Sequence, residues 1–312
     1  MTDPRLEPRY TGIPTFMRVP HHTDPAGAAV ALYGIPYDGG VTNRPGARHG
    51  PREIRNQSSL TRAVNHATRV DPFELVDVVD VGDVEFSNLF DIETVYDDIR
   101  DFVARIVTAG ARPLGAGGDH SVTHPVLRAV AADRPVAVVH IDAHTDTWGP
   151  FKGSKFHHGS PFRLAVEEGL IEPERMIQIG IRGAQNDPDP WNFSEQSGMR
   201  VIYIEEFESL GVDGVIAEAR RVVGDEPTYV TFDVDGLDPV YAPGTGTPEV
   251  GGITTREALG LLRGLRGLDL VGGDVVEVAP PFDPSGNTAL VGATLMYEIL
   301  CLLAEAGASP SG

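Results

Sequence analysis

The sequence predicts an α/β protein, a three-layer α/β/α fold around a central, mostly parallel sheet of about eight strands. Two observations indicate this class. Short apolar runs alternate along the chain with longer segments in which apolar residues recur at helical spacing. The short runs are almost continuously apolar, as in strands that are covered on both faces of a parallel sheet. The segments between them are long enough to supply the crossover helices that parallel strands require.

A single large domain is expected. The chain has 312 residues, of which 41% are hydrophobic, so it can bury a large core. No internal repeat or linker divides it, and we assign the domain to residues 29–306. We expect residues 1–28 to form a Pro-rich N-terminal arm and residues 307–312 a flexible C-terminal tail. The arm contains PTFMRVP, which is apolar enough to pack on the domain or on a neighbouring subunit.

The chain is strongly acidic, with 45 Asp and Glu residues against 25 Lys and Arg residues and a formal net charge of −20. This charge argues against a nucleic-acid partner, because no basic surface outweighs the acidic background. It suits attraction of cations, either metal ions or a positively charged substrate, although an acidic surface also serves solubility alone.

No segment approaches the roughly 18 consecutive apolar residues of a membrane span, and the start, MTDPRLEPRY, lacks the pattern of a secretory signal. We therefore predict a cytoplasmic protein without membrane association. The single cysteine, Cys301, excludes a disulfide within the chain. Its apolar surroundings predict a buried structural thiol.

The first half of the domain is expected to contain four strands and three helices. The strand at 29–35 leads into a long Gly- and Pro-rich loop, and Pro51 is typical of a first helical turn. Residues 89–109 carry apolar residues at helical spacing, and the glycines at 117–118 permit a tight turn between strand and helix. The expected strands are 29–35, 75–81, 112–116 and 136–146, and the expected helices are 51–65, 89–109 and 122–131.

The second half continues the alternation. A Gly-rich loop precedes a helix that begins at about Pro161, and residues 214–223 have an amphipathic repeat. The segment TYVTFDVD, at 228–235, reads as a buried strand with acids at its end. The expected strands are 176–181, 201–204, 228–235 and 269–278, and the remaining expected helices are 214–223, 254–263 and 288–306.

Three metal-competent side chains follow the apolar run in VAVVHIDAHTD: Asp142, His144 and Asp146. In an extended backbone alternate residues point to the same side, so these three would project together from the carboxyl end of the strand. Taken alone, such a pattern is equally compatible with a turn of solvated acids.

Other strand ends carry polar residues too. Asp233 and Asp235 repeat the alternate spacing, His120 follows two glycines after a strand, and Glu277 ends the last strand. Ligands of open parallel sheets bind beyond the carboxyl ends of the strands. Carboxylates gathered there would raise one another's pKa values unless a cation neutralised them, which predicts a dinuclear metal site.

Oxygen-rich ligation with two imidazoles and no thiolate favours Mn²⁺, with Ni²⁺, Co²⁺ and Zn²⁺ as alternatives. In a site with two ions, a water between them loses a proton near neutral pH and becomes a nucleophile. The expected reaction is therefore a hydrolysis.

Five motifs occur in order along the chain: GGDHSVTHP, VHIDAHTDT, HGSPFR, TFDVDGLDPVYAPGTGTPEVGG and DVVEVAPPFD. Together they resemble the ureohydrolase superfamily of arginase and agmatinase. The resemblance implies two metal ions that share Asp142 and Asp233 as bridging ligands. It implies one ion with the further ligands His120 and Asp146, and a second ion with the further ligands His144 and Asp235.

The resemblance also implies the catalytic residues. Glu277 would orient a guanidinium group, which is a planar cation and a poor electrophile. Asp146 would protonate the departing amine, and His158 would return the next proton from solvent. The products would be urea and an amine. By the same resemblance we expect a homotrimer or homohexamer.

Several neighbouring residues are expected only to support the site. Asp119 and Asp238 are predicted to be turn acids or acids behind the ligands, and His140 a satisfied core histidine. His124 and His157 are expected at supporting or surface positions. The turn at 245–248 is expected in the wall of the pocket.

Two alternatives compete with this reaction. Zinc-dependent deacetylases use the same type of fold with a single metal, but His120, the Asp233–Asp235 pair and Glu277 argue against them. A catalytically silent, regulatory relative would have lost a ligand, and all six ligand positions are filled.

The resemblance is closest to the agmatinase-like branch, in particular to bacterial guanidinopropionases and guanidinobutyrases, through segments such as TNRPGARHGPREIRNQSSL. It predicts a short guanidino acid as substrate, 3-guanidinopropionate first, with agmatine, 4-guanidinobutanoate and free guanidine as alternatives. Arg44, Arg48 and His49 could bind the substrate carboxylate or could hold their own loop. The net charge favours the second positive charge of agmatine.

Overall fold

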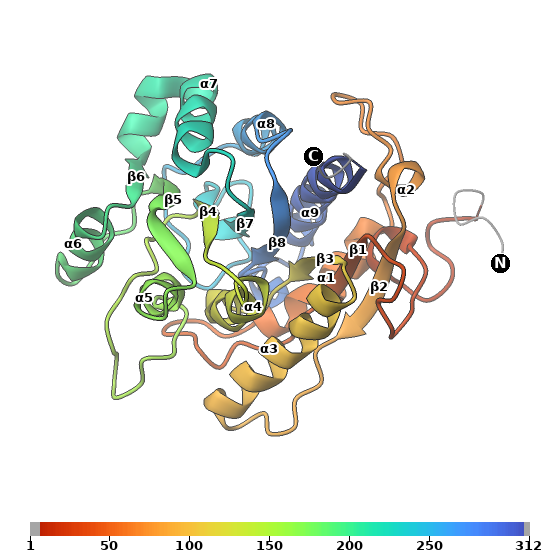
Figure 1. The fold of residues 1–312 in the computed structure, drawn as a ribbon, viewed down its shortest axis with the longest axis horizontal. Coiled ribbons are helices and arrows are strands. Elements are labelled where there is room, and N and C mark those ends of the chain that lie inside the picture. The colour runs from red at the N-terminus through yellow and green to blue at the C-terminus, as the bar shows by residue number, and fades with distance from the viewer. Residues whose placement is uncertain (1–6, 309–312) are drawn as a thin grey trace.

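The computed structural model of the protein describes residues 7–308. Eight strands form one sheet in the order β2-β1-β3-β8-β7-β4-β5-β6, and every neighbouring pair is parallel (Figure 1). The predicted fold class is confirmed. The strands are β1 (Val30–Gly34), β2 (Val78–Asp83), β3 (Arg112–Ala116), β4 (Val136–Ile141), β5 (Ile171–Ile181), β6 (Arg200–Tyr203), β7 (Thr228–Asp233) and β8 (Leu270–Val276).

Helices cover both faces of this sheet. Alternate strand residues point to opposite faces, so Leu32 packs in the core with α1, α7, α8 and α9, and Tyr33 packs with α3, α4 and α5 (Figure 1). The helices are α1 (Gly50–Ser58), α2 (Pro72–Leu75), α3 (Ile92–Thr108), α4 (Thr123–Val130), α5 (Pro161–Glu167), α6 (Asp189–Gln196), α7 (Ile204–Val223), α8 (Thr255–Gly264) and α9 (Asn287–Ala308).

The strand order decides where the site lies. β3 and β4 follow each other along the chain, but β8 and β7 lie between them in the sheet, and α4 makes the crossover. The four central strands are thus β3, β8, β7 and β4. Their carboxyl ends are adjacent, and each is followed by polar residues singled out from the sequence.

Two elements differ from the predicted bounds because local hydrogen bonds redirect the chain. α1 ends at Ser58 instead of residue 65, where the Ser58 hydroxyl donates to the Arg55 carbonyl (2.9 Å) and accepts from the Met17 amide (2.8 Å). The strand expected at 75–81 begins only at Val78. The preceding turn is helical, because the Asp71 side chain accepts from two backbone amides and caps α2.

Other helices were missed or shortened in the prediction. α6 was not predicted, and the helix expected at 214–223 is the second part of α7. α7 is interrupted at Gly211, whose φ is 64° and ψ is 171°. Because this glycine interrupts the helical pattern, the sequence did not show that Ile204–Val223 forms one element.

The extended ligand-bearing strand ends were also predicted wrongly. β4 stops at Ile141 and β7 stops at Asp233, so the residues that follow lie in turns. Asp146 has a φ of 50° and Glu277 a φ of 62°. The side chains still reach one site, but tight turns and not an extended backbone direct them there.

The described part of the N-terminal arm packs on the domain. Phe16 and Met17 are buried, and the Phe16 amide donates to Asp80 on β2 (3.0 Å). At the other end, α9 continues to Ala308, two residues beyond the predicted helix, and residues 309–312 of the expected tail lie outside the described residues.

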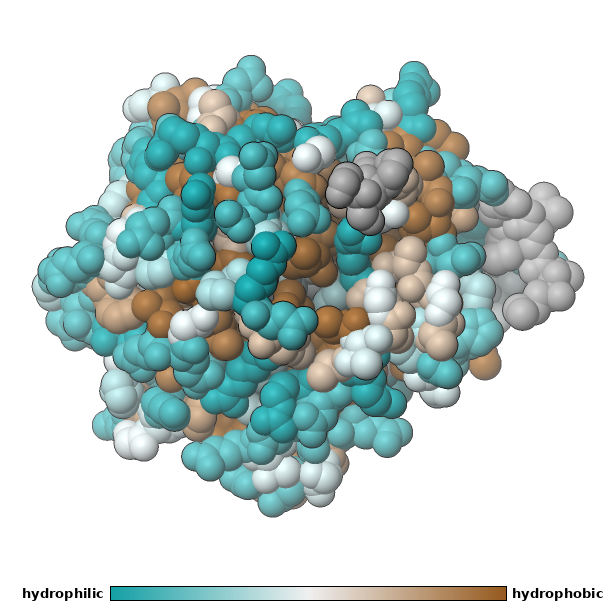
Figure 2. Space-filling model, in the orientation of Figure 1, coloured by the Kyte–Doolittle hydropathy of each residue, from teal (hydrophilic) through white to brown (hydrophobic). Residues whose placement is uncertain are grey.

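Contrary to the expectation from the sequence, α9 is long and apolar enough to cross a membrane, but 72% of its most apolar stretch is buried inside the protein, as in a core helix. Cys301 on α9 is buried as predicted. Hydrophilic residues cover most of the face of the molecule in Figure 2, with smaller hydrophobic areas between them.

Candidate metal centre

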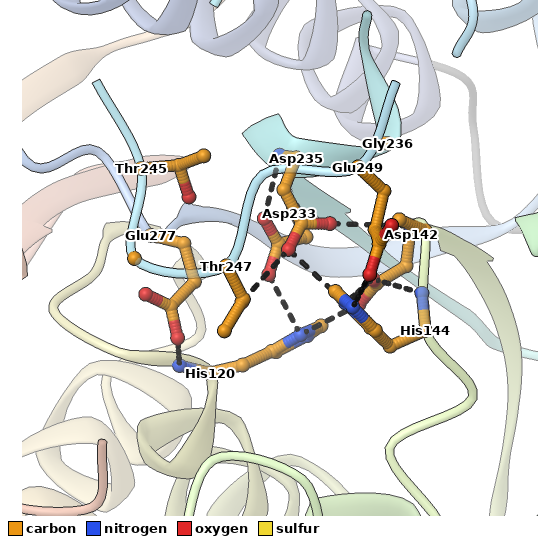
Figure 3. Close-up of polar contacts among 12 residues, drawn as sticks. His120, Asp142, His144, Asp233, Asp235, Gly236, Thr245, Thr247, Glu249 and Glu277 are labelled. Atoms are coloured by element: carbon orange, nitrogen blue, oxygen red, sulfur yellow. Dashed lines mark hydrogen bonds and ion pairs between the residues drawn. The ribbon is translucent and has the colours of Figure 1, made fainter. Parts of the chain in front are cut away.

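The first half of the site gathers around His120, which follows β3 in the turn His120–Val122. Its Nδ1 lies 3.0 Å from carboxylate oxygens of both Asp142 and Asp146. It also lies 3.4 Å from Asp233 Oδ2, and Figure 3 shows Asp142 and Asp233 beside His120. This nitrogen is buried and has no hydrogen-bond partner of good geometry among the described residues. Three carboxylates that converge on one ring nitrogen form a donor set that fits a cation.

The second half gathers around His144. Its Nδ1 lies 3.1 Å from Asp235 Oδ2 and 3.4 Å from Asp142 Oδ1. Ligand atoms of His144, Asp142 and Asp235 all lie within 4.8 Å of one another, close enough to hold one ion. Asp142 faces His120 with Oδ2 and His144 with Oδ1, so it lies between the two halves. The structure thus brings all six predicted ligands together.

The electrostatics of the cluster call for a cation. Burial and the neighbouring Asp235 raise the pKa of Asp233 well above its usual value. Burial raises the pKa of Asp235 to about 6. Against the effect of burial, Asp142 and Asp146 raise the pKa of His120 well above its usual value. Without metal, protons would occupy the space that divalent ions fill when they bind. The chain therefore fits a binuclear divalent site.

Buried polar residues hold the ligands from behind. His140 Nε2 donates to Asp142 Oδ2 (2.7 Å), and its Nδ1 accepts from the Gln178 amide (3.2 Å). His140 is a satisfied core histidine, as predicted, but it also orients Asp142, one of the predicted ligands, which the prediction missed. Its position two residues before Asp142 was the available signal. Gln178 gave no such signal, because it comes from the neighbouring strand.

Glu277 lies beside the cluster. Its Oε1 accepts a hydrogen bond from the His120 backbone amide (3.0 Å) and lies 3.0 Å from His158 Nδ1. Its Oε2 is buried and has no hydrogen-bond partner among the described residues. A Cβ added at Gly246 would lie 3.5 Å from Oε2, so the turn that contains Gly246 passes close to this oxygen. Glu277 thus has one buried carboxylate oxygen that is engaged by none of the described residues.

His158 connects Glu277 to the loop after β1 that contains Thr42 (residues 35–46), which we call the entrance loop. Its Nε2 lies 2.7 Å from the hydroxyl of Thr42, a contact that sequence analysis missed. Burial opposes protonation, but the hydrogen bond and the charge of Glu277 raise the pKa of His158 to about 9. Behind them, burial and the charge of Glu277 raise the pKa of Asp119 to about 6. Asp119 accepts from Gly40 and Ser121 amides and supports the loop as predicted.

A cavity of about 430 Å³ opens above the cluster. Its lining comes from the metal cluster, the entrance loop and the turn after β7: Thr42, Asn43, Arg44, His144, Asp146, Trp148, His158, Gly159, Ala184, Asp233, Asp235, Thr247, Pro248 and Glu249. The predicted wall at 245–248 is thus represented by two of its residues. Asp238 lies outside the lining and accepts from backbone amides, as expected of a turn acid.

Arg44 and Arg48 lie close together in the chain but have different partners. Arg44 lines the cavity, donates to the carbonyls of Thr245 (2.6 Å) and Gly246 (3.2 Å), and stacks on Phe282. Arg48 instead pairs with the buried Asp38 and does not line the cavity. Arg48 therefore holds its own loop, which is one of the two roles expected for it. His49 is exposed and also lies outside the lining.

Comparison with known families decides what this site belongs to. Residues 28–302 match the model of the arginase family. The chain belongs to this family. The membership confirms the resemblance drawn from the motifs.

Individual members of the arginase family are closely similar to the chain. Guanidinopropionase of Pseudomonas aeruginosa is 58% identical, over 96% of this chain and 95% of that protein. The mitochondrial agmatinase of Gallus gallus is 47% identical, over 95% and 87%. The solved structure of proclavaminate amidino hydrolase from Streptomyces clavuligerus superposes with a TM-score of 0.93 at 44% identity, over 96% of this chain and 100% of that chain.

Proposed function

We propose that this arginase-family protein hydrolyses a short guanidino acid, 3-guanidinopropionate first, to urea and an amine. The observation that supports this substrate assignment is the 58% identity to a guanidinopropionase over almost the whole of both chains. The reaction class rests on the geometry of the site. Six metal-competent side chains surround one position, and an open carboxylate oxygen of Glu277 lies beside them.

Two divalent ions would occupy the cluster, Mn²⁺ first and Ni²⁺ second. His120 and Asp146 would serve one ion, His144 and Asp235 the other, and Asp142 and Asp233 both. When bound, the ions supply Lewis acidity and lower the pKa of a water between them. The oxygen-rich donor set supports Mn²⁺ over softer ions.

The side chains of the protein would then divide the remaining work. Glu277 Oε2 accepts hydrogen bonds from the substrate guanidinium and holds its carbon toward the metal ligands. Asp146, at the cavity wall, would take up the proton that the attacking water loses and donate it to the departing amine. His158, with its raised pKa, holds the proton that replaces it, and Thr42 links His158 to the cavity entrance.

Arg44 is the candidate for the carboxylate end of the substrate. Among the described residues that line the cavity, it is the one Arg or Lys. Its Nε and one terminal nitrogen bind backbone carbonyls, which leaves the other terminal nitrogen for a carboxylate.

A second candidate function, agmatinase activity, is favoured by Glu249. This carboxylate also lines the cavity, and it would suit the second cation of agmatine. The 47% identity to an agmatinase supports the same alternative.

The test is urea release from a panel of 3-guanidinopropionate, 4-guanidinobutanoate, agmatine, arginine and guanidine, with Mn²⁺ and then Ni²⁺. We expect the highest kcat/KM for 3-guanidinopropionate. At least tenfold higher kcat/KM for agmatine than for every guanidino acid would replace the substrate and keep the reaction. Absence of urea from all five compounds with metal-loaded protein would favour a silent relative.

We also propose that the protein is a cytoplasmic homotrimer or homohexamer. The N-terminal arm supports the assembly, because Tyr10 and Ile13 are about nine-tenths exposed (91% and 90%) and apolar. A monomeric mass in light scattering at micromolar concentration would contradict this.

A further inference from the structure

A row of buried polar side chains crosses the middle of the sheet beneath the metal ligands. Four neighbouring strands, β8, β7, β4 and β5, are in register at Asp274, Thr231, His140 and Gln178. Residues in register on parallel strands point to the same face. All four side chains are fully buried, and we call them the polar row. Burial of polar side chains destabilises a fold unless they are hydrogen-bonded. The presence of four such side chains in the core therefore indicates that they have a role.

Two members of the polar row contact metal ligands directly. His140 donates to Asp142, as described above. Thr231 Oγ1 lies 3.0 Å from Nε2 of His120, the ring nitrogen opposite the one that faces the carboxylates. The row therefore supports two ligands of the same half of the site from behind.

Asp274 decides the direction of the Thr231 contact. Its Oδ2 accepts from the hydroxyls of Thr123 (2.8 Å) and Tyr229 (2.9 Å). Its Oδ1 is buried with no hydrogen-bond partner among the described residues, and Thr231 is its register neighbour on β7. This unpaired oxygen is an acceptor beside Thr231, so we infer that the Thr231 hydroxyl can donate to Asp274 while its oxygen accepts from His120.

This direction fixes the state of His120. A Thr231 hydroxyl that donates to Asp274 accepts from His120, so the ring proton lies on Nε2. Nδ1 is then the nitrogen that loses its proton when an ion binds, and it faces Asp142, Asp146 and Asp233. A metal ligand needs this arrangement, in which the other ring nitrogen donates to a partner behind it.

We propose that Thr231 and Asp274 are positioning residues, which hold His120 in the tautomer that binds a divalent ion. Asp274 acts through Thr231 and touches neither metal nor substrate. The inference rests on the proposed metal site, and it extends the site by one layer into the core of the sheet.

Four variants test the proposal. Thr231→Val keeps the shape and removes the hydroxyl, and Thr231→Ser keeps the hydroxyl. Asp274→Asn removes the carboxylate charge. Thr123→Val is the matched control, because it removes one donor to Asp274 and leaves His120 untouched. Metal-free samples are titrated with Mn²⁺ by calorimetry, and Tm is measured with and without Mn²⁺.

We expect Thr231→Val to weaken binding of one ion about 10- to 100-fold, with a smaller gain in Tm on Mn²⁺ binding. Thr231→Ser should bind Mn²⁺ with nearly the wild-type affinity, and Asp274→Asn should bind one of the two ions more weakly. Thr123→Val should keep the wild-type affinity for both ions. Wild-type affinity in Thr231→Val, or an equal loss in Thr231→Ser or in Thr123→Val, would overturn the proposal.

If Thr231→Val does not fold, Asp274→Asn decides, and unchanged Mn²⁺ affinity in that variant would overturn the proposal. Urea release tests the proposed function separately. Wild-type protein that binds Mn²⁺ but hydrolyses no guanidino compound would overturn the function and leave this inference standing.

Discussion

Glu277 Oε1 lies 3.0 Å from His158 Nδ1, while Oε2 of the same carboxylate is buried and open. One oxygen is thus engaged by the protein and the other is free for a ligand. Since Glu277 also accepts from the His120 amide, its orientation is coupled to the start of the metal cluster. If the proposed roles hold, Glu277 contacts the substrate and not the ions.

Glu277→Gln should therefore keep its metal and lose activity. An amide has a single acceptor oxygen, so its NH2 group would face either the guanidinium or the His120 amide and His158, and we expect a loss of roughly 3 kcal/mol, about a hundredfold in kcat/KM. Elemental analysis and urea release on the same sample measure both quantities. Loss of metal from this variant would show that Glu277 is itself a ligand.

Asp235→Ala should lose one of two bound ions and most turnover, because Asp235 contacts His144 in the second half of the cluster. Asp225→Ala, which removes an exposed acid, is the control for the change in net charge. The metal content per chain is measured by elemental analysis. One tightly held ion per active wild-type chain would contradict the dinuclear site.

The pH dependence of the stability should report the titration of His158. Its pKa is raised from 6.5 to about 9, so its contribution to stability is complete below about pH 6.5 and is lost as the pH rises through about 9. The loss should be up to about 3 kcal/mol in the metal-free protein. Chemical unfolding at pH 6, 8 and 10 measures it, with His158→Asn as the reference. Parallel pH profiles for both proteins would show that His158 does not titrate in this range.

The sequence predicted the ligand residues because each one follows an apolar run that reads as a strand. Asp142, His144 and Asp146 could be found without any knowledge of the strand order. The turn geometry could not, since the positive φ of Asp146 and Glu277 follows from contacts with other segments. An extended backbone was therefore expected where tight turns occur.

The residues behind the ligands escaped sequence analysis for a different reason. Thr231 and Asp274 become neighbours only because β7 and β8 pair in one register, and Thr42 reaches His158 from a loop 116 positions away. Such pairs depend on a strand order in which β8 and β7 lie between β3 and β4. Local patterns do not contain that order.

The choice of substrate should depend on Arg44. If its guanidinium binds the substrate carboxylate, Arg44→Gln should lower kcat/KM for 3-guanidinopropionate at least about tenfold and affect agmatine much less, since a charged hydrogen bond contributes about 1.5–3 kcal/mol. Arg48→Gln is the matched control, because Arg48 belongs to the same loop but pairs with Asp38 away from the cavity.

The ratio of the two substrates distinguishes this role from a structural one. Arg44 also holds the turn through the Thr245 and Gly246 carbonyls, so a general distortion would lower turnover of both substrates equally. An unchanged ratio of kcat/KM values in Arg44→Gln would therefore assign Arg44 to the turn alone. A ratio shifted toward agmatine, with Arg48→Gln unchanged, would place the substrate carboxylate at Arg44.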